Sequence, residues 1–225
     1  LSFPLLFLLL LLLLSNPVMV AEAATIPTEF GAANIAATIV DLEDQGYSGT
    51  IPTQLGLMVD VTNFDLSSNG FTRPLPTECG ILTKLKQFRA ASNQITGRVP
   101  TELTLLTAVE SYFDLYTNEF TGPIPTQYGR FTSMTTRFRF YDNEFSSTLP
   151  TELALMTGLT SSFGVHSNQL TGRAPTELGL LTAMDSYFEM YTNEFTGPIP
   201  TQYGRFTSMT TKFRFYDNEF SSTLP

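Results

Sequence analysis

The stretch that decides the fold runs from Pro100 to Ile124 and reads PTELTLLTAVESYFDLYTNEFTGPI. Its first proline returns every 24 or 25 residues, and each return brings a short apolar phrase, an asparagine and a second apolar residue. A fixed period in this range is typical of a solenoid, in which each repeat contacts only its neighbours. The period predicts one elongated domain of about eight repeats over residues 24–225. The recurring prolines are Pro27, Pro52, Pro76, Pro100, Pro125, Pro150, Pro175, Pro200 and Pro225.

The phrase Phe113-Asp114-Leu115 has a counterpart in every repeat, with an inward pair of residues around one outward residue. Alternation with a period of two is the pattern of a β-strand that is buried on one face. Stacked repeats would then build a parallel sheet with one short strand from each repeat. The phrases are Val40–Leu42, Phe64–Leu66, Phe88–Ala90, Phe113–Leu115, Phe138–Phe140, Phe163–Val165, Phe188–Met190 and Phe213–Phe215.

An asparagine follows every phrase except the first, where Gln45 stands in its place. The chain must turn there inside the stack, so its backbone N–H and C=O groups lose contact with water. An amide side chain offers both donors and an acceptor and can satisfy such groups. We interpret this column as structural, and it comprises Asn69, Asn93, Asn118, Asn143, Asn168, Asn193 and Asn218.

The pattern IPTELGxLTxL, followed by Phe-x-Leu-x-x-Asn-x-Phe-Thr-Gly-x-Ile-Pro, covers residues 26–225. It resembles the plant-type leucine-rich repeat of receptor-kinase ectodomains and polygalacturonase-inhibitor-like proteins. The resemblance implies a β-rich α/β solenoid: a right-handed superhelix with a concave parallel sheet and short 3₁₀ or helical turns on the convex side. It also implies a second short strand near Thr121–Pro125. The chain departs from the family by using Phe for the first strand Leu and by lacking the cysteine-flanked N-terminal cap.

The N-terminal residues differ in composition from the repeats. An apolar run ends at Leu14, Asn16-Pro17 interrupts it, and Ala21-Glu22-Ala23 offers a small-x-small cleavage site. These features predict a signal peptide over residues 1–23 without its basic start, and hence a secreted or cell-surface protein. A retained membrane anchor is the alternative, although a spanning helix needs about 20 apolar residues.

The ends of the sequence suggest a fragment. It starts without methionine and stops at Leu224-Pro225 in the middle of a repeat, so we expect a truncated C-terminus. A membrane segment and a signalling domain could follow Pro225, which would make the chain the ectodomain of a membrane leucine-rich-repeat receptor-like protein or kinase.

Composition excludes several classes of function. A net charge of −9 offers no basic stripe for nucleic acid. The single cysteine, Cys79, stands at a leucine position and is predicted to be a core residue. With His166 as the only histidine, no catalytic triad or zinc site is expected, and no enzyme activity, metal or cofactor is predicted. Asp41, Glu43 and Asp44 could hold Ca²⁺ weakly, but a solvated acidic face explains them better.

The outward strand residues of a concave sheet form the candidate binding surface, which would take a protein, peptide or glycan. Tyr and Arg dominate binding hot spots, and both gather in the C-terminal half of this surface. An alternative is self-pairing, with Asp114 beside Arg139 and Glu189 beside Arg214. The candidate residues are Tyr112, Tyr116, Arg139, Tyr141, Gly164, His166, Tyr187, Glu189, Tyr191 and Tyr216.

One repeat carries small outward residues between these aromatic blocks, namely Ser162 and Gly164, followed by His166. We expect a notch there, walled by Tyr141 and Tyr191, with His166 at its edge. His166 could make the site sensitive to pH, or it could be an exposed histidine without a special role.

A longer period overlies the first, because residues 106–150 return almost unchanged at 181–225. The five differences each keep charge or apolar character, as in Asp114 to Glu189 and Arg137 to Lys212. Duplication of a block of three repeats explains this, so part of the repeated surface could be inherited without being used.

A column of threonines follows the prolines and suggests a function of another class. A flat ladder of hydroxyls could order water against ice, whereas a local explanation is that each threonine caps a short helical turn. A purely structural or adhesive surface protein is a further alternative. The column comprises Thr28, Thr53, Thr77, Thr101, Thr126, Thr151, Thr176 and Thr201.

Overall fold

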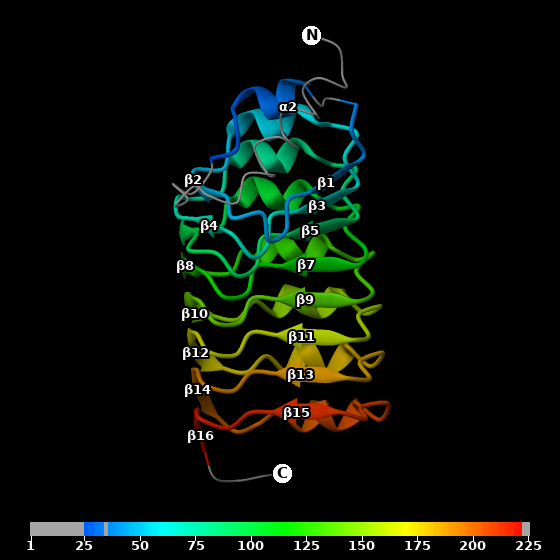
Figure 1. The fold of residues 1–225 in the computed structure, drawn as a ribbon. Coiled ribbons are helices and arrows are strands. Elements are labelled where there is room, and N and C mark those ends of the chain that lie inside the picture. Colours follow the sequence, from blue (N-terminus) through cyan, green and yellow to red (C-terminus); the bar gives the residue numbers. More distant parts are fainter. Residues whose placement is uncertain (1–24, 34–35, 222–225) are drawn as a thin grey trace.

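Each repeat contributes one three-residue strand to a parallel sheet that follows the axis of the stack (Figure 1). The computed structural model describes residues 25–33 and 36–221. Within these residues the strands of this main sheet follow one another in chain order, and Phe138, Phe163 and Phe188 lie level in neighbouring strands. The predicted strands are confirmed, each starting one residue before its phrase. They are β1 (Ile39–Asp41), β3 (Asn63–Asp65), β5 (Gln87–Arg89), β7 (Tyr112–Asp114), β9 (Arg137–Arg139), β11 (Ser162–Gly164), β13 (Tyr187–Glu189) and β15 (Lys212–Arg214).

A second set of short parallel strands lies beside the main sheet (Figure 1). The strand implied by the resemblance is present, but it spans Glu119–Gly122 and so starts before Thr121. Phe120 points into the core from it. These strands are β2 (Ser48–Gly49), β4 (Gly70–Phe71), β6 (Thr96–Gly97), β8 (Glu119–Gly122), β10 (Glu144–Thr148), β12 (Gln169–Arg173), β14 (Glu194–Gly197) and β16 (Glu219–Phe220).

Short 3₁₀ helices form the side of the stack opposite the main sheet (Figure 1). Each of η1 to η7 begins at the threonine that follows a repeat proline, and these prolines enter the turn in an extended or nearly extended conformation, whereas α2 is an α-helix that begins at Glu29. Together with the parallel strands they make a β-rich α/β solenoid, as predicted. The helices are α2 (Glu29–Ala33), η1 (Thr53–Leu57), η2 (Thr77–Ile81), η3 (Thr101–Leu105), η4 (Thr126–Arg130), η5 (Thr151–Leu155), η6 (Thr176–Leu180) and η7 (Thr201–Arg205).

The expectation that the threonines cap these helices is wrong. The N-cap residue of η3 is Pro100, which has no side-chain hydrogen bond to offer, and Thr101 is already the first helical residue. The hydroxyl of Thr101 instead donates to the carboxylate of Glu102 over 3.3 Å. The threonine column is therefore exposed without the local role that the sequence suggested.

Phenylalanines in place of leucines fill the space between the two sheets and the helices. Phe138, Phe163 and Phe188 are fully buried, with ring centroids 6.0 and 5.2 Å apart along the stack. Burial of each ring contributes about 2–3 kcal/mol of hydrophobic stabilisation. Cys79 lies in the same core as predicted, and burial raises the pKa of its thiol to about 12.

The asparagine column joins neighbouring repeats inside the turn. The Asn143 amide donates to the carbonyl oxygens of Leu115, Phe140 and Tyr141 over 3.0–3.2 Å, and its oxygen accepts from the Phe120 N–H at 3.0 Å. Each asparagine thus satisfies backbone groups of two repeats, which fixes the strand ends of the main sheet relative to one another.

The residue before each asparagine adopts positive φ, which turns the asparagine inward. Serine and aspartate occupy most of these positions. Thr117 (φ 52°) and Thr192 (φ 51°) are β-branched, and this conformation is costly for them. The turn after β7 and the turn after β13 therefore carry equivalent backbone strain.

Two predictions fall on residues outside the described part of the chain. These are the signal peptide at residues 1–23 and the chain end at Leu224-Pro225. Among the described residues, the helices are too short and too polar for any of them to cross a bilayer.

Candidate functional site

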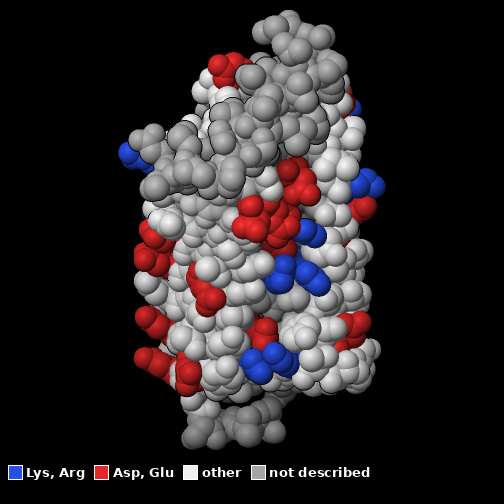
Figure 2. Space-filling model, in the orientation of Figure 1, with Lys and Arg blue, Asp and Glu red and all other residues white. Residues whose placement is uncertain are grey.

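The outer face of the main sheet changes sign along the stack. Figure 2 shows acidic side chains gathered toward the N-terminal end and basic side chains over the middle and the C-terminal end. Asp41 ends β1, whereas β9 supplies Arg137 and Arg139 and β15 supplies Lys212 and Arg214. A basic region thus stands on a protein whose net charge is −9.

Five rings stack in register along this face and form an aromatic ladder. Strands about 4.8 Å apart bring equivalent rings to stacking distance. Successive centroids lie 4.5, 4.3, 4.1 and 4.6 Å apart. The ring faces therefore cover one another, and the ladder offers its edges to a ligand. Its members are Tyr116, Tyr141, His166, Tyr191 and Tyr216.

His166 lines the cavity together with Tyr141 and Tyr191, but it is buried, not the exposed histidine that the sequence suggested. Its ring lies between those of Tyr141 and Tyr191, and only 6% of the residue is exposed. The imidazole continues the tyrosine stack, because it is flat and of similar width. The three rings together form one wall of the site.

Ion pairs join neighbouring strands, as the self-pairing alternative predicted. The Arg139 guanidinium donates two hydrogen bonds to Asp114, over 2.7 and 2.6 Å, and Asp114 is only 1% exposed. Arg214 donates to Glu189 over a longer 3.4 Å. The first pair is bidentate and closed, whereas the second leaves both groups able to meet a ligand.

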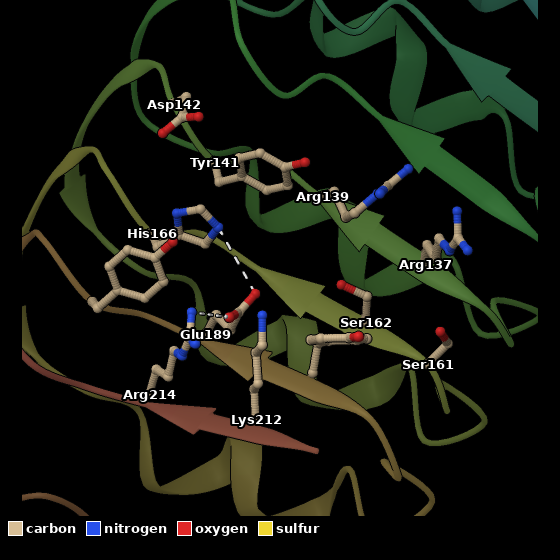
Figure 3. Close-up of a pocket in the computed structure, with 12 residues that line it drawn as sticks. Arg137, Arg139, Tyr141, Asp142, Ser161, Ser162, His166, Glu189, Lys212 and Arg214 are labelled. Atoms are coloured by element: carbon tan, nitrogen blue, oxygen red, sulfur yellow. Dashed lines mark hydrogen bonds and ion pairs between the residues drawn. The ribbon is translucent and has the colours of Figure 1, made fainter.

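A cavity of about 510 Å³ opens between β9 and β15. Gly164 lies in register between Arg139 and Glu189, and an added Cβ there would meet the Tyr141 ring at 3.2 Å. A side chain at this position of β11 would crowd the Tyr141 ring, which lines the cavity. Figure 3 shows its basic, acidic and aromatic side chains converging from β9, β11, β13 and β15.

Two cations of the cavity lack a carboxylate within ion-pair distance among the described residues: Arg137 and Lys212. Arg137 lies 5.1 Å from the centroid of the Tyr112 ring, and Lys212 lies 5.4 Å from that of Tyr187. Such contacts hold a cation in place and leave its donors available.

Burial sets the protonation of the titratable wall. Burial, opposed by Asp142 and aided by Arg214, lowers the pKa of His166 to about 4. Burial raises the pKa of Tyr141 to about 12 against the effect of Arg139. At neutral pH the wall therefore presents a neutral imidazole and neutral phenols. Burial also raises the pKa of Glu189, which Arg214 and Lys212 oppose.

The structure brings six of the ten candidate residues together around the cavity, whereas Gly164 is not among the lining residues, although it lies in register between Arg139 and Glu189. Tyr112, Tyr116 and Tyr216 belong to the same face but do not line the cavity. The six are Arg139, Tyr141, His166, Tyr187, Glu189 and Tyr191.

Other lining residues were missed as candidates, and a signal for them was present in the sequence. Arg137 starts β9, the strand next to the β11 strand of Gly164, and Lys212 starts β15, two strands from β11 on the other side. The remaining missed residues are Asp142, Ser161, Ser162 and Arg214.

The acidic end of the face does not form a metal site in the part of the chain that the structure describes, where no three His, Cys, Asp or Glu side chains are arranged to hold an ion. The Asp41 carboxylate accepts a hydrogen bond from the Glu43 N–H at 3.3 Å.

No family model matches the sequence, and no curated protein matches it. Solved structures do. The ectodomain of the Arabidopsis thaliana membrane receptor kinase GASSHO1/SCHENGEN3, solved with Casparian strip integrity factor 2, is 29% identical with a TM-score of 0.81. The match covers 88% of this chain and 23% of that one.

Two further structures share the fold. The Arabidopsis receptor kinase HAESA, solved with the peptide hormone IDA and a co-receptor, is 29% identical with a TM-score of 0.80, over 88% of this chain and 32% of that one. A plant ice-binding protein is 19% identical with a TM-score of 0.69, over 91% of this chain and 72% of that one. The chain has the leucine-rich-repeat fold, and it spans less than a third of the length of both receptors.

Proposed function

We propose that the chain is a non-enzymatic leucine-rich-repeat module that binds a protein or peptide segment on the outer face of its main sheet. An anionic group of that segment enters the cavity between β9 and β15. The observation that carries the proposal is the pair of cations, Arg137 and Lys212, that line the cavity without a carboxylate partner among the described residues.

The charge inventory of the cavity favours an anion. Four lining residues are cationic, whereas Asp142 and Glu189 are anionic and His166 is neutral at pH 7. Arg and Lys donors that are already held in place bind a carboxylate or an oxyanion by charge-assisted hydrogen bonds. The low exposure of the surrounding wall strengthens such contacts, because water screens them less.

The aromatic ladder favours a protein or peptide over a glycan. Stacking of a sugar needs an open ring face, but the faces of Tyr141, His166 and Tyr191 cover one another. The ladder offers edges and polar groups, which suit the amides and side chains of a peptide. HAESA, solved with a peptide hormone, shows that a module with this fold can hold such a ligand.

The structural neighbours also support a place outside the cell, because GASSHO1/SCHENGEN3 and HAESA were solved as receptor-kinase ectodomains. The chain would then act as a secreted or cell-surface protein. As an alternative, it is the ectodomain fragment of a membrane leucine-rich-repeat receptor-like protein or kinase.

Selection from a displayed library of random peptides tests the proposal. The wild type should enrich peptides that contain Asp, Glu or a free carboxyl terminus, and their binding should weaken as salt rises. The double variant Arg137→Gln/Lys212→Gln should lose at least tenfold in affinity, while the exposed control Lys84→Gln should bind as the wild type does. Enrichment of neutral peptides that bind the double variant equally well would contradict the proposal.

Ice binding is a second candidate, and the failed capping explanation is the observation that favours it. The threonine column is exposed, and the one local role that could explain it is absent at η1 to η7. Neighbouring carboxylates such as Glu102 accept from the hydroxyls, which weakens the resemblance to an apolar ice face. Thermal hysteresis that disappears in Thr126→Arg would support this function, and its absence from the wild type would reject it.

A further inference from the structure

We propose that His166 contacts the ligand directly and takes up a proton when an anionic group enters the cavity, so that binding strengthens as the pH falls. This rests on the function proposed above and defines the protonation state in which the site holds its ligand. The proton comes from solvent, and the imidazole that receives it becomes a further cation of the cavity.

The ring of His166 is fixed in a position from which it can act. Tyr141 and Tyr191 hold it from both faces at centroid distances of 4.3 and 4.1 Å. Nδ1 lies 3.2 Å from the Ser167 hydroxyl, and Nε2 points into the cavity, 3.9 Å from the Glu189 carboxylate (Figure 3). That distance is too long for a hydrogen bond, so Nε2 can still donate to a ligand.

The surroundings of the ring favour its neutral form, although not every group beside it acts in that direction. Burial and Arg214 disfavour the charged form, whereas Asp142 favours it, and together they lower the pKa of His166 to about 4. Two tyrosine faces also attract a cation that lies between them. The titratable or charged groups that face the ring are Tyr141 and Asp142 after β9, Glu189 and Tyr191 from β13 and the turn after it, and Arg214 of β15.

An anion beside Nε2 favours the protonated form of the ring. An opposite charge within about 4–6 Å moves a pKa by about one to three units toward the charged form. A rise of about two units in the pKa of His166 would make binding about tenfold tighter at pH 5 than at pH 7, because the bound state holds a proton that the free state lacks.

Glu189 is the rival explanation for any such pH dependence. Burial raises its pKa, and its protonation would release Arg214 for a ligand. Measured affinity alone therefore cannot assign the proton. His166 is the only histidine of the chain, so its ring gives a single, unambiguous NMR signal.

The experiment uses sulfate, which stays ionised between about pH 3.5 and 7.5, with chloride holding the ionic strength constant. The His166 ring signal is followed against pH, with and without sulfate, and sulfate affinity is measured at pH 5 and pH 7. Three variants are compared with the wild type: His166→Phe keeps the stack without a titrating nitrogen, Glu189→Gln removes the rival group, and Gly164→Gln fills the cavity.

Three results are distinguishable. The proposal expects a midpoint about two units higher with sulfate in the wild type and in Glu189→Gln, no such change in Gly164→Gln, and no pH-dependent affinity in His166→Phe. Sulfate binding with an unmoved His166 midpoint, or a pH dependence that survives in His166→Phe, overturns the role of His166 and leaves the anion site standing. Absence of sulfate binding at both pH values overturns the anion site as well.

Discussion

The outer face of the main sheet contains two copies of a four-strand arrangement that carry similar side chains in their last two strands and different ones in their first two, and the cavity lies in the second copy. The first copy spans β3 to β9 and the second spans β9 to β15. Gly164 of the second copy takes the place that Arg89 holds three repeats earlier. Arg89 lies 4.1 Å from the centroid of the Tyr112 ring and donates to Asp65 over 3.0 Å, so it fills the space that Gly164 leaves open.

The two copies also differ in the sign of the wall that faces this space. The side chain that fills this space in the first copy is the cation Arg89, and the carboxylate of Asp65 faces it. In the second copy Arg139 stands in the position of Asp65. A ligand group that enters the cavity of the second copy should therefore be an anion. Between the first and the second copy, glycine replaces Arg89 and arginine replaces Asp65, and an internally satisfied surface becomes a candidate binding site.

The largest expected effect concerns the two carboxylates at equivalent positions. Asp114→Asn should lower the free energy of unfolding by about 4 kcal/mol, because it leaves the Arg139 guanidinium partly buried without its bidentate partner. Glu189→Gln should cost only about 1 kcal/mol, because Arg214 is more exposed and its bond is longer.

Urea denaturation of both variants measures this difference, with the exposed Asp60→Asn as a control that should change stability by less than about 0.5 kcal/mol. Equal costs for Asp114→Asn and Glu189→Gln would mean that the second copy is as closed as the first.

The second effect is a pH dependence confined to the open copy, where His166 replaces Ala91. Its folded-state pKa, about 4, is below the usual value, so the unfolded chain binds more protons between about pH 4 and 6.5. Stability should therefore fall on acidification through this window, by about 3 kcal/mol. Denaturation curves of the wild type and His166→Phe should diverge as the pH rises from 4 to 6.5; parallel curves would show that the folded structure does not hold His166 neutral.

The third effect opens the first copy. Arg89→Gly should cost about 2 kcal/mol, because Asp65 is 9% exposed and loses its partner. Millimolar methylguanidinium should restore part of the lost melting temperature in this variant and not in the wild type. An unchanged melting temperature with methylguanidinium would show that removal of the Arg89 side chain leaves no site for a free cation.

The smallest effect tests whether the copies share one backbone. Thr117→Asn and Thr192→Asn should each stabilise the protein by about 0.5 kcal/mol, because asparagine adopts positive φ at lower cost. Melting temperatures of the two variants should rise by similar amounts. A clear difference between them would show that the copies differ in backbone as well as in surface.

The architecture was predictable because the sequence of each repeat determines its own strand and turn. The eight phrases lie within one residue of the observed strands, and Cys79 lies in the core that its leucine position predicted. The threonine caps were predicted wrongly, because the residue before the helix is proline and the threonine is already inside it. A shift of one residue at a helix start is enough to remove a cap.

The site was predictable only in part, because it depends on which of several reachable partners each side chain chooses. The sequence predicted a notch at Gly164 between Tyr141 and Tyr191, and both tyrosines line the cavity, but Gly164 is not among its lining residues. It could not decide whether Arg139 would reach Asp114 or remain free, nor that the His166 ring would enter the tyrosine stack. Those outcomes depend on ångström-level distances between neighbouring strands, which a repeat period does not specify.

The most direct test of the account is the affinity of the selected acidic peptide for Gly164→Gln, which gives the open copy a side chain as the first copy has in Arg89. The matched control is Gly204→Gln, at a glycine whose added Cβ meets nothing within 4 Å. The account predicts at least a tenfold loss of affinity in Gly164→Gln, at a temperature where melting curves show the variant to be folded, and unchanged binding in the control. Equal affinity of Gly164→Gln and the wild type would contradict it.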